Sequence, residues 1–183
     1  MTNLKPLTLF FFLQAIILIT SIPTTYSRNT FPLNDEKLSS LIENTCKKTP
    51  NYNICIQSLK QNSGSSVADV TGLAQIMVKV MKAKANDGLN KIHQLQRVRN
   101  GGARKVLSSC GDKYRAILVA DIPQAIEALE KGDPKFAEDG ANDAANEASY
   151  CESEFNGKSP LTIQNNAMHD VSVVTAAMVR QLL

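Results

Sequence analysis

Four long segments of this chain place apolar residues at alternating steps of three and four, and this pattern restricts the fold more than any other feature. Such spacing marks one face of an α-helix. The segments cover residues 67–98, 103–129, 137–155 and 161–182, and the connections between them are short. Because short connections make consecutive long helices antiparallel, the sequence predicts an all-α fold with an up-and-down antiparallel four-helix bundle over residues 67–183.

The third segment differs from the others in the size of its inward residues. They are mostly small, namely Ala137, Ala141, Ala144, Ala148, Cys151 and Phe155. Alternating steps of four and three are also those of a coiled-coil seam. We therefore expect this helix to approach its neighbours closely, packed among three bulkier helices.

A proline lies inside the second segment, at position 123. Proline lacks a backbone N–H and its ring clashes with the preceding turn, so we expect the helix to kink or to restart there. Asp121 stands where its side chain would cap the continuation.

Residues 36–61 are predicted to form a hairpin of two shorter helices ahead of the bundle. Helices of this length are marginal alone, but a bridge between Cys46 and Cys55 would close a short loop and hold them together. Cys110 and Cys151 fall on the inward stripes of adjacent antiparallel helices. Of the three connectivities that four cysteines allow, we therefore expect two disulfides, Cys46–Cys55 and Cys110–Cys151.

The first 27 residues have the composition of a secretory signal peptide. Lys5 precedes an apolar run at 7–22, and a stretch of small polar residues ends at Ser27. The run is too short for a membrane span and is interrupted by Gln14, so we expect cleavage near Ser27, with an uncleaved signal anchor as the alternative. The secreted domain would then be residues 28–183, with no attachment to the membrane.

The charge of that domain gives no indication of a nucleic-acid partner. The full chain has a net charge of +3, and residues 1–27 contain one lysine and no acidic residue, which leaves +2. The aromatic residues are few and scattered, so neither a basic stripe nor a stacking platform is evident.

Histidines and acidic pairs offer little for catalysis. Neither His93 nor His169 has a serine or cysteine nearby in a nucleophile motif. The acidic pairs at 138–139 and 152–154 are one or two residues apart, and such neighbours do not face each other on a helix, so we interpret them as capping or solvated residues. Cysteine and histidine spacings typical of zinc are missing. The sequence predicts a binding protein rather than an enzyme, with no metal and no cofactor.

The stretch GDPKFAEDG, residues 132–140, starts the third bundle helix. Asp133 suits the N-cap of that helix and Pro134 its first position. Lys135 and Phe136 need another explanation, because an acidic residue would suit the helix dipole better than a lysine does. The alternatives are simple helix punctuation and an exposed hook that another protein recognises.

Several stretches of the chain resemble the plant invertase inhibitors, whose superfamily also contains the pectin methylesterase inhibitors. They are CKKTPNYNIC at 46–55, the later Cys110 and Cys151, ADIPQAIEALEKGDPKFAEDG at 120–140 and FNGKSPLT at 155–162. The resemblance extends over the whole of residues 28–183. It implies a four-helix bundle with an N-terminal helical hairpin, and disulfides that join the first cysteine to the second and the third to the fourth.

The resemblance also implies a function and a binding motif. Invertase inhibitors insert a Pro-Lys-Phe motif into the active-site cleft of an acid invertase, a glycoside hydrolase of the retaining type, and inhibit it competitively. Pro134, Lys135 and Phe136, with Asp133 holding the backbone, are therefore the expected target-binding residues. A retaining enzyme has two close carboxyl groups, among which the Lys135 ammonium would lie.

Other readings of the sequence remain. The chain could inhibit pectin methylesterase through a helix face, although inhibitors of that enzyme generally lack the Pro-Lys-Phe motif. It could also be a secreted regulatory pro-region or a small hydrolase. We expect it in the cell wall or the vacuole, as a monomer or a weak homo-oligomer.

Overall fold

The computed structural model describes residues 35–62 and 69–183. The helices are α2 (Asp35–Cys46), α3 (Tyr52–Asn62), α4 (Val70–Val98), α5 (Gly101–Ala116), the π-helix η1 (Ile117–Asp121), α6 (Ile122–Lys131), α7 (Pro134–Ser153), α8 (Thr162–Val179) and the 3₁₀-helix η2 (Arg180–Leu182). The expected signal peptide at 1–27 lies outside the described residues, as do positions 67 and 68. Among residues 35–62 and 69–183, no helix has the length and apolar character that crossing a membrane requires.

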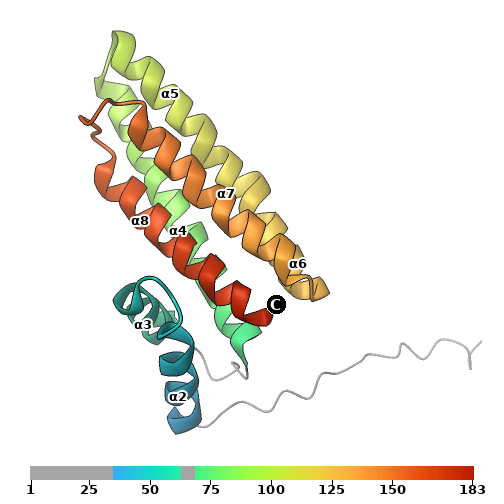
Figure 1. Cartoon of the computed structure of the whole chain (residues 1–183). Helices are drawn as coiled ribbons and strands as arrows, with labels where there is room; N and C mark the ends of the chain where they lie inside the picture. The colour runs from blue at the N-terminus through green and yellow to red at the C-terminus, as the bar shows by residue number, and fades with distance from the viewer. Residues whose placement is uncertain (1–34, 63–68) are drawn as a thin grey trace, which may run out of the picture. The chain divides into compact units, whose positions relative to one another are not determined.

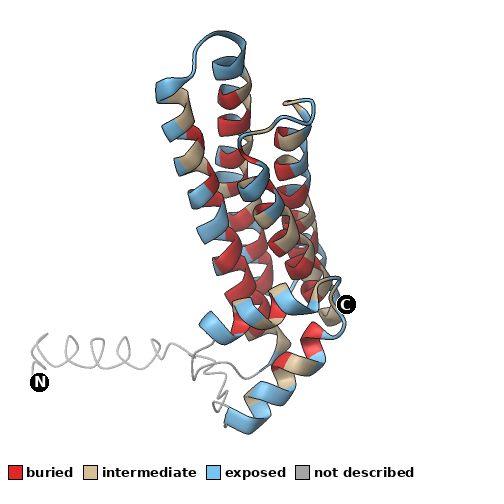
Figure 2. Ribbon diagram, turned by 90° about the vertical axis from the view of Figure 1, so that its left-hand side faces the viewer, coloured by how far each residue is buried: buried red, intermediate tan, exposed pale blue. Residues whose placement is uncertain are grey.

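The bundle consists of four antiparallel rods, and the predicted all-α architecture is confirmed (Figure 1). One rod is continuous through α5, η1 and α6, and the others are α4, α7 and α8. Helix α4 packs on α5 and α8, while α7 packs on α6 and α8. The buried residues line the faces that the rods turn toward one another, whereas the outer faces are exposed (Figure 2).

The small-residue seam of α7 lies in the centre of this packing. Its alanines and Cys151 have no exposed surface, as predicted. Gly140, on the same helix, shows how closely the backbones approach, because a Cβ atom there would lie 2.6 Å from the main-chain oxygen of Asp121. A helix with a bulky seam could not take this position, since interiors are already close-packed.

The rod formed by α5, η1 and α6 continues through Pro123 without a break. The five-residue π-helix η1 precedes Pro123, and the N–H of Ile122 donates to the carbonyl of Ile117, five residues earlier. The wider π turn accommodates the proline because the ring clashes with an ordinary α-helical turn before it. The predicted interruption is therefore a change of helix type.

The expectation that Asp121 caps the continuation is wrong. Its backbone is helical, with φ −64° and ψ −46°, and its side chain makes no capping hydrogen bond. The Oδ2 atom is buried without a hydrogen-bond partner. Burial, together with the nearby charges of Asp143 and Glu147, raises the pKa of Asp121 to about 6. A residue inside a continuous helix cannot take the extended backbone that an N-cap needs.

Both disulfides join the cysteines that the sequence paired. Cys46–Cys55 links α2 to α3, with a Cα–Cα distance of 5.5 Å, and Cys110–Cys151 links α5 to α7 at 4.9 Å. All four cysteines are buried. The α2–α3 hairpin packs against α4 and α8, and the side-chain amide of Gln181 donates to the carbonyl of Thr45 at 3.1 Å.

Candidate functional site

The turn between α6 and α7 places residues 134–136 on the surface. Gly132 ends α6 in the left-handed region, with φ +74° and ψ +33°, and the N–H of Asp133 donates to the carbonyl of Ala128 at 2.8 Å. Glycine takes this conformation without a steric penalty. Pro134 follows at the first position of α7, where its missing N–H has no consequence. The backbone that leads into Lys135 and Phe136 is thus fixed.

Asp133 lies just before α7, as predicted, but its side chain does not cap the helix. It makes no capping hydrogen bond, and only its main-chain oxygen accepts from the N–H of Ala137, at 3.4 Å. The backbone has φ −111° and ψ 78°, away from the usual extended conformation of a capping aspartate. Asp133 therefore contributes to the turn through its main chain.

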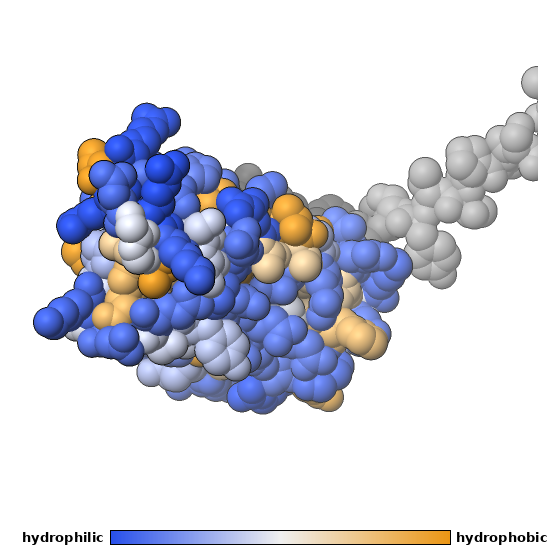
Figure 3. Space-filling model, turned by 90° about the horizontal axis from the view of Figure 1, so that it is seen from above, coloured by the Kyte–Doolittle hydropathy of each residue, from blue (hydrophilic) through white to orange (hydrophobic). Residues whose placement is uncertain are grey.

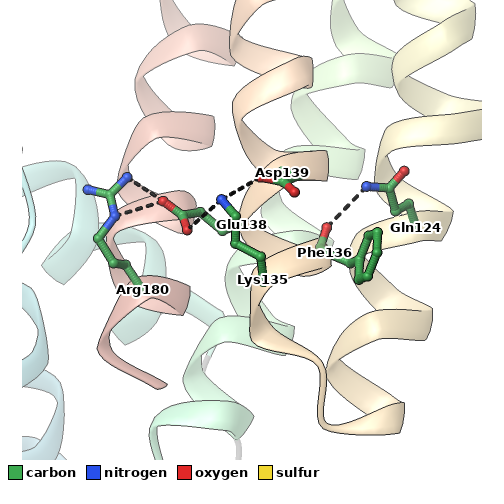
Figure 4. A network of polar contacts seen from close by, with 6 residues as sticks. All are labelled: Gln124, Lys135, Phe136, Glu138, Asp139 and Arg180. Atoms are coloured by element: carbon green, nitrogen blue, oxygen red, sulfur yellow. Dashed lines mark hydrogen bonds and ion pairs between the residues drawn. The ribbon is translucent and has the colours of Figure 1, made fainter. Parts of the chain in front are cut away.

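Lys135 is exposed, yet its ammonium group has two partners on its own helix (Figure 4). Its Nζ atom lies 2.8 Å from Asp139 Oδ1 and 3.4 Å from Glu138 Oε2, and 60% of its side chain is accessible. The hydrogen bond to Asp139 raises the pKa of Lys135, so the side chain is charged throughout the acidic and neutral range. The partners at three and four residues onward also explain why a lysine is tolerated in a first helical turn.

Glu138 is buried, which contradicts its interpretation as a solvated or capping residue. Its side chain is only 7% exposed, and Oε1 accepts from Arg180 Nε at 2.7 Å and from the Arg180 terminal nitrogen at 2.5 Å. Arg180 comes from η2, after α8, and it holds the carboxylate from the opposite side to Lys135 (Figure 4). A buried carboxylate needs such charged partners to offset its lost hydration.

Phe136 points away from this network and borders a hollow in the surface. More than half of the residue is exposed (57%), and its carbonyl accepts from the side-chain amide of Gln124 at 3.1 Å. The hollow has a volume of about 600 Å³ and lies between η1, α6 and the start of α7. Its lining residues are Ala120, Pro123, Gln124, Glu127, Ala128, Lys131, Asp133 and Phe136. The site therefore combines a cation, an aromatic ring and an adjoining concave surface.

The second acidic pair has a structural position and is likewise not simply solvated. Glu152 accepts from the Asn165 amide at 2.6 Å and from the Thr162 hydroxyl at 2.6 Å, and the Tyr114 hydroxyl donates to Asn165 at 2.9 Å. Glu154 pairs with Lys113 at 2.8 Å. These contacts join α5, α7 and α8, so they account for both carboxylates without a catalytic role.

The remaining candidates do not form a reaction centre. His93 is exposed, and His169 is hydrogen-bonded to the neighbouring Asp170. No group of three metal-ligating side chains occurs within the part of the chain that the structure describes. On the face shown in Figure 3, apolar side chains are scattered among hydrophilic ones.

The sequence did not identify Arg180 or Gln124 as part of the site. Arg180 is 42 residues from Glu138 along the chain, and Gln124 is 12 residues from Phe136, so only tertiary packing brings them together. Glu138 and Asp139 carried a usable signal, because residues three and four positions after Lys135 lie beside it on a helix.

Known proteins share this fold and parts of this sequence. The model of the family described as "Plant invertase/pectin methylesterase inhibitor" matches residues 40–181. The chain is 45% identical over 139 residues to "Cell wall / vacuolar inhibitor of fructosidase 1" of Arabidopsis thaliana, which covers 76% of this chain and 67% of that protein. It is 33% identical over 103 residues to "Cell wall / vacuolar inhibitor of fructosidase 2" of the same plant, covering 55% of this chain and 57% of that protein.

A solved structure supports the fold. The crystal structure of a mutant form of a pectin methylesterase inhibitor from Arabidopsis superposes with a TM-score of 0.66, covering 75% of this chain and 94% of that one. The two sequences are 19% identical, so this likeness establishes the shared helical architecture alone.

Proposed function

Because the chain belongs to the plant invertase/pectin methylesterase inhibitor family, we propose that it inhibits an acid invertase by placing Pro134, Lys135 and Phe136 in the sucrose-binding cleft. The family and its relatives are inhibitor proteins, so the chain is not an enzyme. The observation that carries the proposal is the exposed pair Lys135–Phe136 on a backbone fixed by Gly132 and Pro134.

The chemistry of the target explains why a lysine would be effective at this position. A retaining glycosidase has two carboxyl groups about 5–5.5 Å apart, one a nucleophile and the other an acid/base. An ammonium group with three donors can lie between them and occupy the place of the substrate. Lys135 stays charged at acidic pH, so it remains able to make this contact in the cell wall or the vacuole.

Phe136 and the rigid turn contribute in a different way. An exposed ring beside the cation can cover an apolar wall of the cleft, and aromatic side chains contribute strongly at the centre of interfaces. Because Gly132 and Pro134 already fix the backbone, little conformational entropy is lost on docking. Residues 1–27 would direct the chain into the secretory pathway, leaving residues 28–183 as the inhibitor domain.

The proposal is tested by measuring inhibition constants for a plant acid invertase and a plant pectin methylesterase, side by side at acidic pH. The full chain is expressed in insect cells and recovered as oxidised, secreted protein. Lys135→Met should weaken invertase inhibition at least about 30-fold, equivalent to about 2 kcal/mol. The matched control is Lys105→Met, which changes an exposed lysine near the start of α5, outside the hollow, and should leave the inhibition constant unchanged.

Two outcomes would contradict the proposal. Equal inhibition by the parent and by Lys135→Met would mean that Lys135 is not the hook. Inhibition of the esterase alone would mean that the motif only starts α7 and that the working surface lies on a helix face.

A further inference from the structure

The Lys135 ammonium is already bound to two carboxylates before any partner arrives. Asp139 Oδ1 lies at 2.8 Å and Glu138 Oε2 at 3.4 Å. A target that offers its own two carboxyl groups must compete with these contacts for the same donors. The affinity that Lys135 contributes to the complex therefore depends on how unfavourable it is for Glu138 and Asp139 to lose their contacts with its ammonium group.

The two carboxylates differ in how easily they can lose the lysine. Asp139 is partly exposed, with 41% of its side chain accessible, so water can replace the ammonium at little cost. Glu138 is buried, and a buried carboxylate without a cation is strongly unfavourable. Release from Glu138 would therefore be difficult if Lys135 were its sole charged partner.

Arg180 removes this difficulty. It donates to Glu138 Oε1 through two nitrogens, at 2.7 and 2.5 Å, while Lys135 contacts the other oxygen (Figure 4). A guanidinium held through two hydrogen bonds keeps its charge and geometry when a neighbour moves. Glu138 would thus remain paired after Lys135 departs.

We propose that Arg180 is a positioning residue that makes Lys135 available to the target, by holding the charge of Glu138 while the ammonium transfers to the carboxyl groups of the partner. This inference rests on the proposed function, since it concerns the same hook. It assigns Asp139 the opposite effect, because this exposed carboxylate competes with the target and has no other cation among the contacts of the described residues.

The test compares inhibition constants for a plant acid invertase with melting temperatures for a set of full-chain variants. Arg180→Gln should weaken inhibition about tenfold, because Glu138 then retains Lys135. Arg180→Lys should restore most of the loss, since a lysine still supplies the charge. Glu138→Gln should inhibit at least as well as the parent, and adding Arg180→Gln to it should change nothing further.

The double variant separates the proposed role from a direct contact. If Arg180→Gln weakens inhibition equally in the parent and in the Glu138→Gln variant, Arg180 touches the target itself and the inference is wrong. If Arg180→Gln lowers the melting temperature but leaves the inhibition constant unchanged, its role is only structural and the inference is equally overturned.

A variant at Asp139 tests the competition for Lys135 without changing the buried carboxylate of Glu138. Asp139→Asn should strengthen inhibition about twofold to fivefold, and this gain should vanish when Lys135 is replaced by Met. A gain that persists without Lys135, or no gain at all, contradicts the competition. If Arg180→Gln loses inhibition but Lys135→Met does not, the proposed binding of the target by Lys135 is wrong. If Lys135→Met loses inhibition but Arg180→Gln does not, only the proposed role of Arg180 is wrong.

Discussion

Helix α7 carries two carboxylates packed against the bundle near its two ends, and they differ in the charge of their partners. Glu138, near the N-terminus, binds the cations Arg180 and Lys135. Glu152, near the C-terminus, accepts hydrogen bonds from the neutral side chains of Asn165 and Thr162. A carboxylate with two cations can lose one and remain paired, whereas one held by neutral donors loses a hydrogen bond with each partner removed. The N-terminal end of α7 is thus suited to exchange partners, and the C-terminal end to fix the bundle.

The largest effect on stability should come from overpacking the core around Tyr114, which is linked to Glu152 at the C-terminal end of α7. A Cβ atom at Gly88 of α4 would lie 2.0 Å from the ring of Tyr114, whose hydroxyl starts the hydrogen-bond chain to Glu152. Gly88→Ala should lower the free energy of unfolding by about 3 kcal/mol, measured by urea denaturation of the oxidised protein. Gly102→Ala is the control, since nothing lies within 4 Å of its added Cβ atom. Equal stability of the two variants would contradict the close packing.

Truncating Asn165, which links Tyr114 to Glu152, should have the next largest effect on stability. Asn165 is buried and bonds both Tyr114 and Glu152, so Asn165→Ala leaves two polar groups without their partner. We expect a loss of about 2 kcal/mol in unfolding free energy, with an unchanged inhibition constant for the folded protein. A variant that keeps its stability but loses inhibition would remove the distinction between the two ends.

Glu152 and a third carboxylate, Asp121, should make the stability of the protein change with pH in opposite directions. Burial raises the pKa of Glu152, but hydrogen bonds from Thr162, Asn165 and Ser159 outweigh it and leave the pKa below its usual value. Glu152 therefore contributes stability above its unfolded pKa, and this contribution is lost as the pH falls through the folded one.

Asp121 has the opposite sign. Its folded pKa of about 6 lies above the usual 3.8, so the folded state binds the proton more tightly and stability falls as the pH rises between these values. Asp121→Asn should abolish this fall and stabilise the protein by about 1 kcal/mol at pH 7, an amount reduced for partial exposure to solvent. Melting temperatures from pH 3.5 to 7.5 check the prediction. An unchanged slope in Asp121→Asn would show that other groups set the dependence.

The smallest effect is expected for an ion pair that belongs to neither end. Glu127 and Lys131 are paired on the exposed face of α6, and they line the hollow beside Phe136. Glu127→Gln should leave the melting temperature unchanged, because exposed pairs contribute little to stability. Clearly weaker inhibition would indicate that the hollow contacts the target.

Local sequence patterns were enough to predict the helices and their inward faces. The seam of α7, the pairing of the cysteines and the position of Pro134 at the start of a helix all follow from spacing within one or two neighbouring segments. The capping roles that the sequence predicted for Asp121 and Asp133 are wrong. An aspartate near a helix start can cap it only if its own backbone is extended, and the surrounding turn decides that conformation.

The sequence by itself determined the four-helix architecture and the two bridges, because each depends on periodicity or on the chemistry of nearby residues, whereas the exposure of the Lys135–Phe136 pair is seen in the structure. The tertiary structure alone decided the environment of that pair. Glu138 is buried and bound by Arg180 only because η2 returns to the start of α7, across 42 residues of chain. Spacing along one helix shows that Lys135 and Glu138 can meet, but it cannot show which second cation supports the carboxylate, since that contact arises from packing between separate elements.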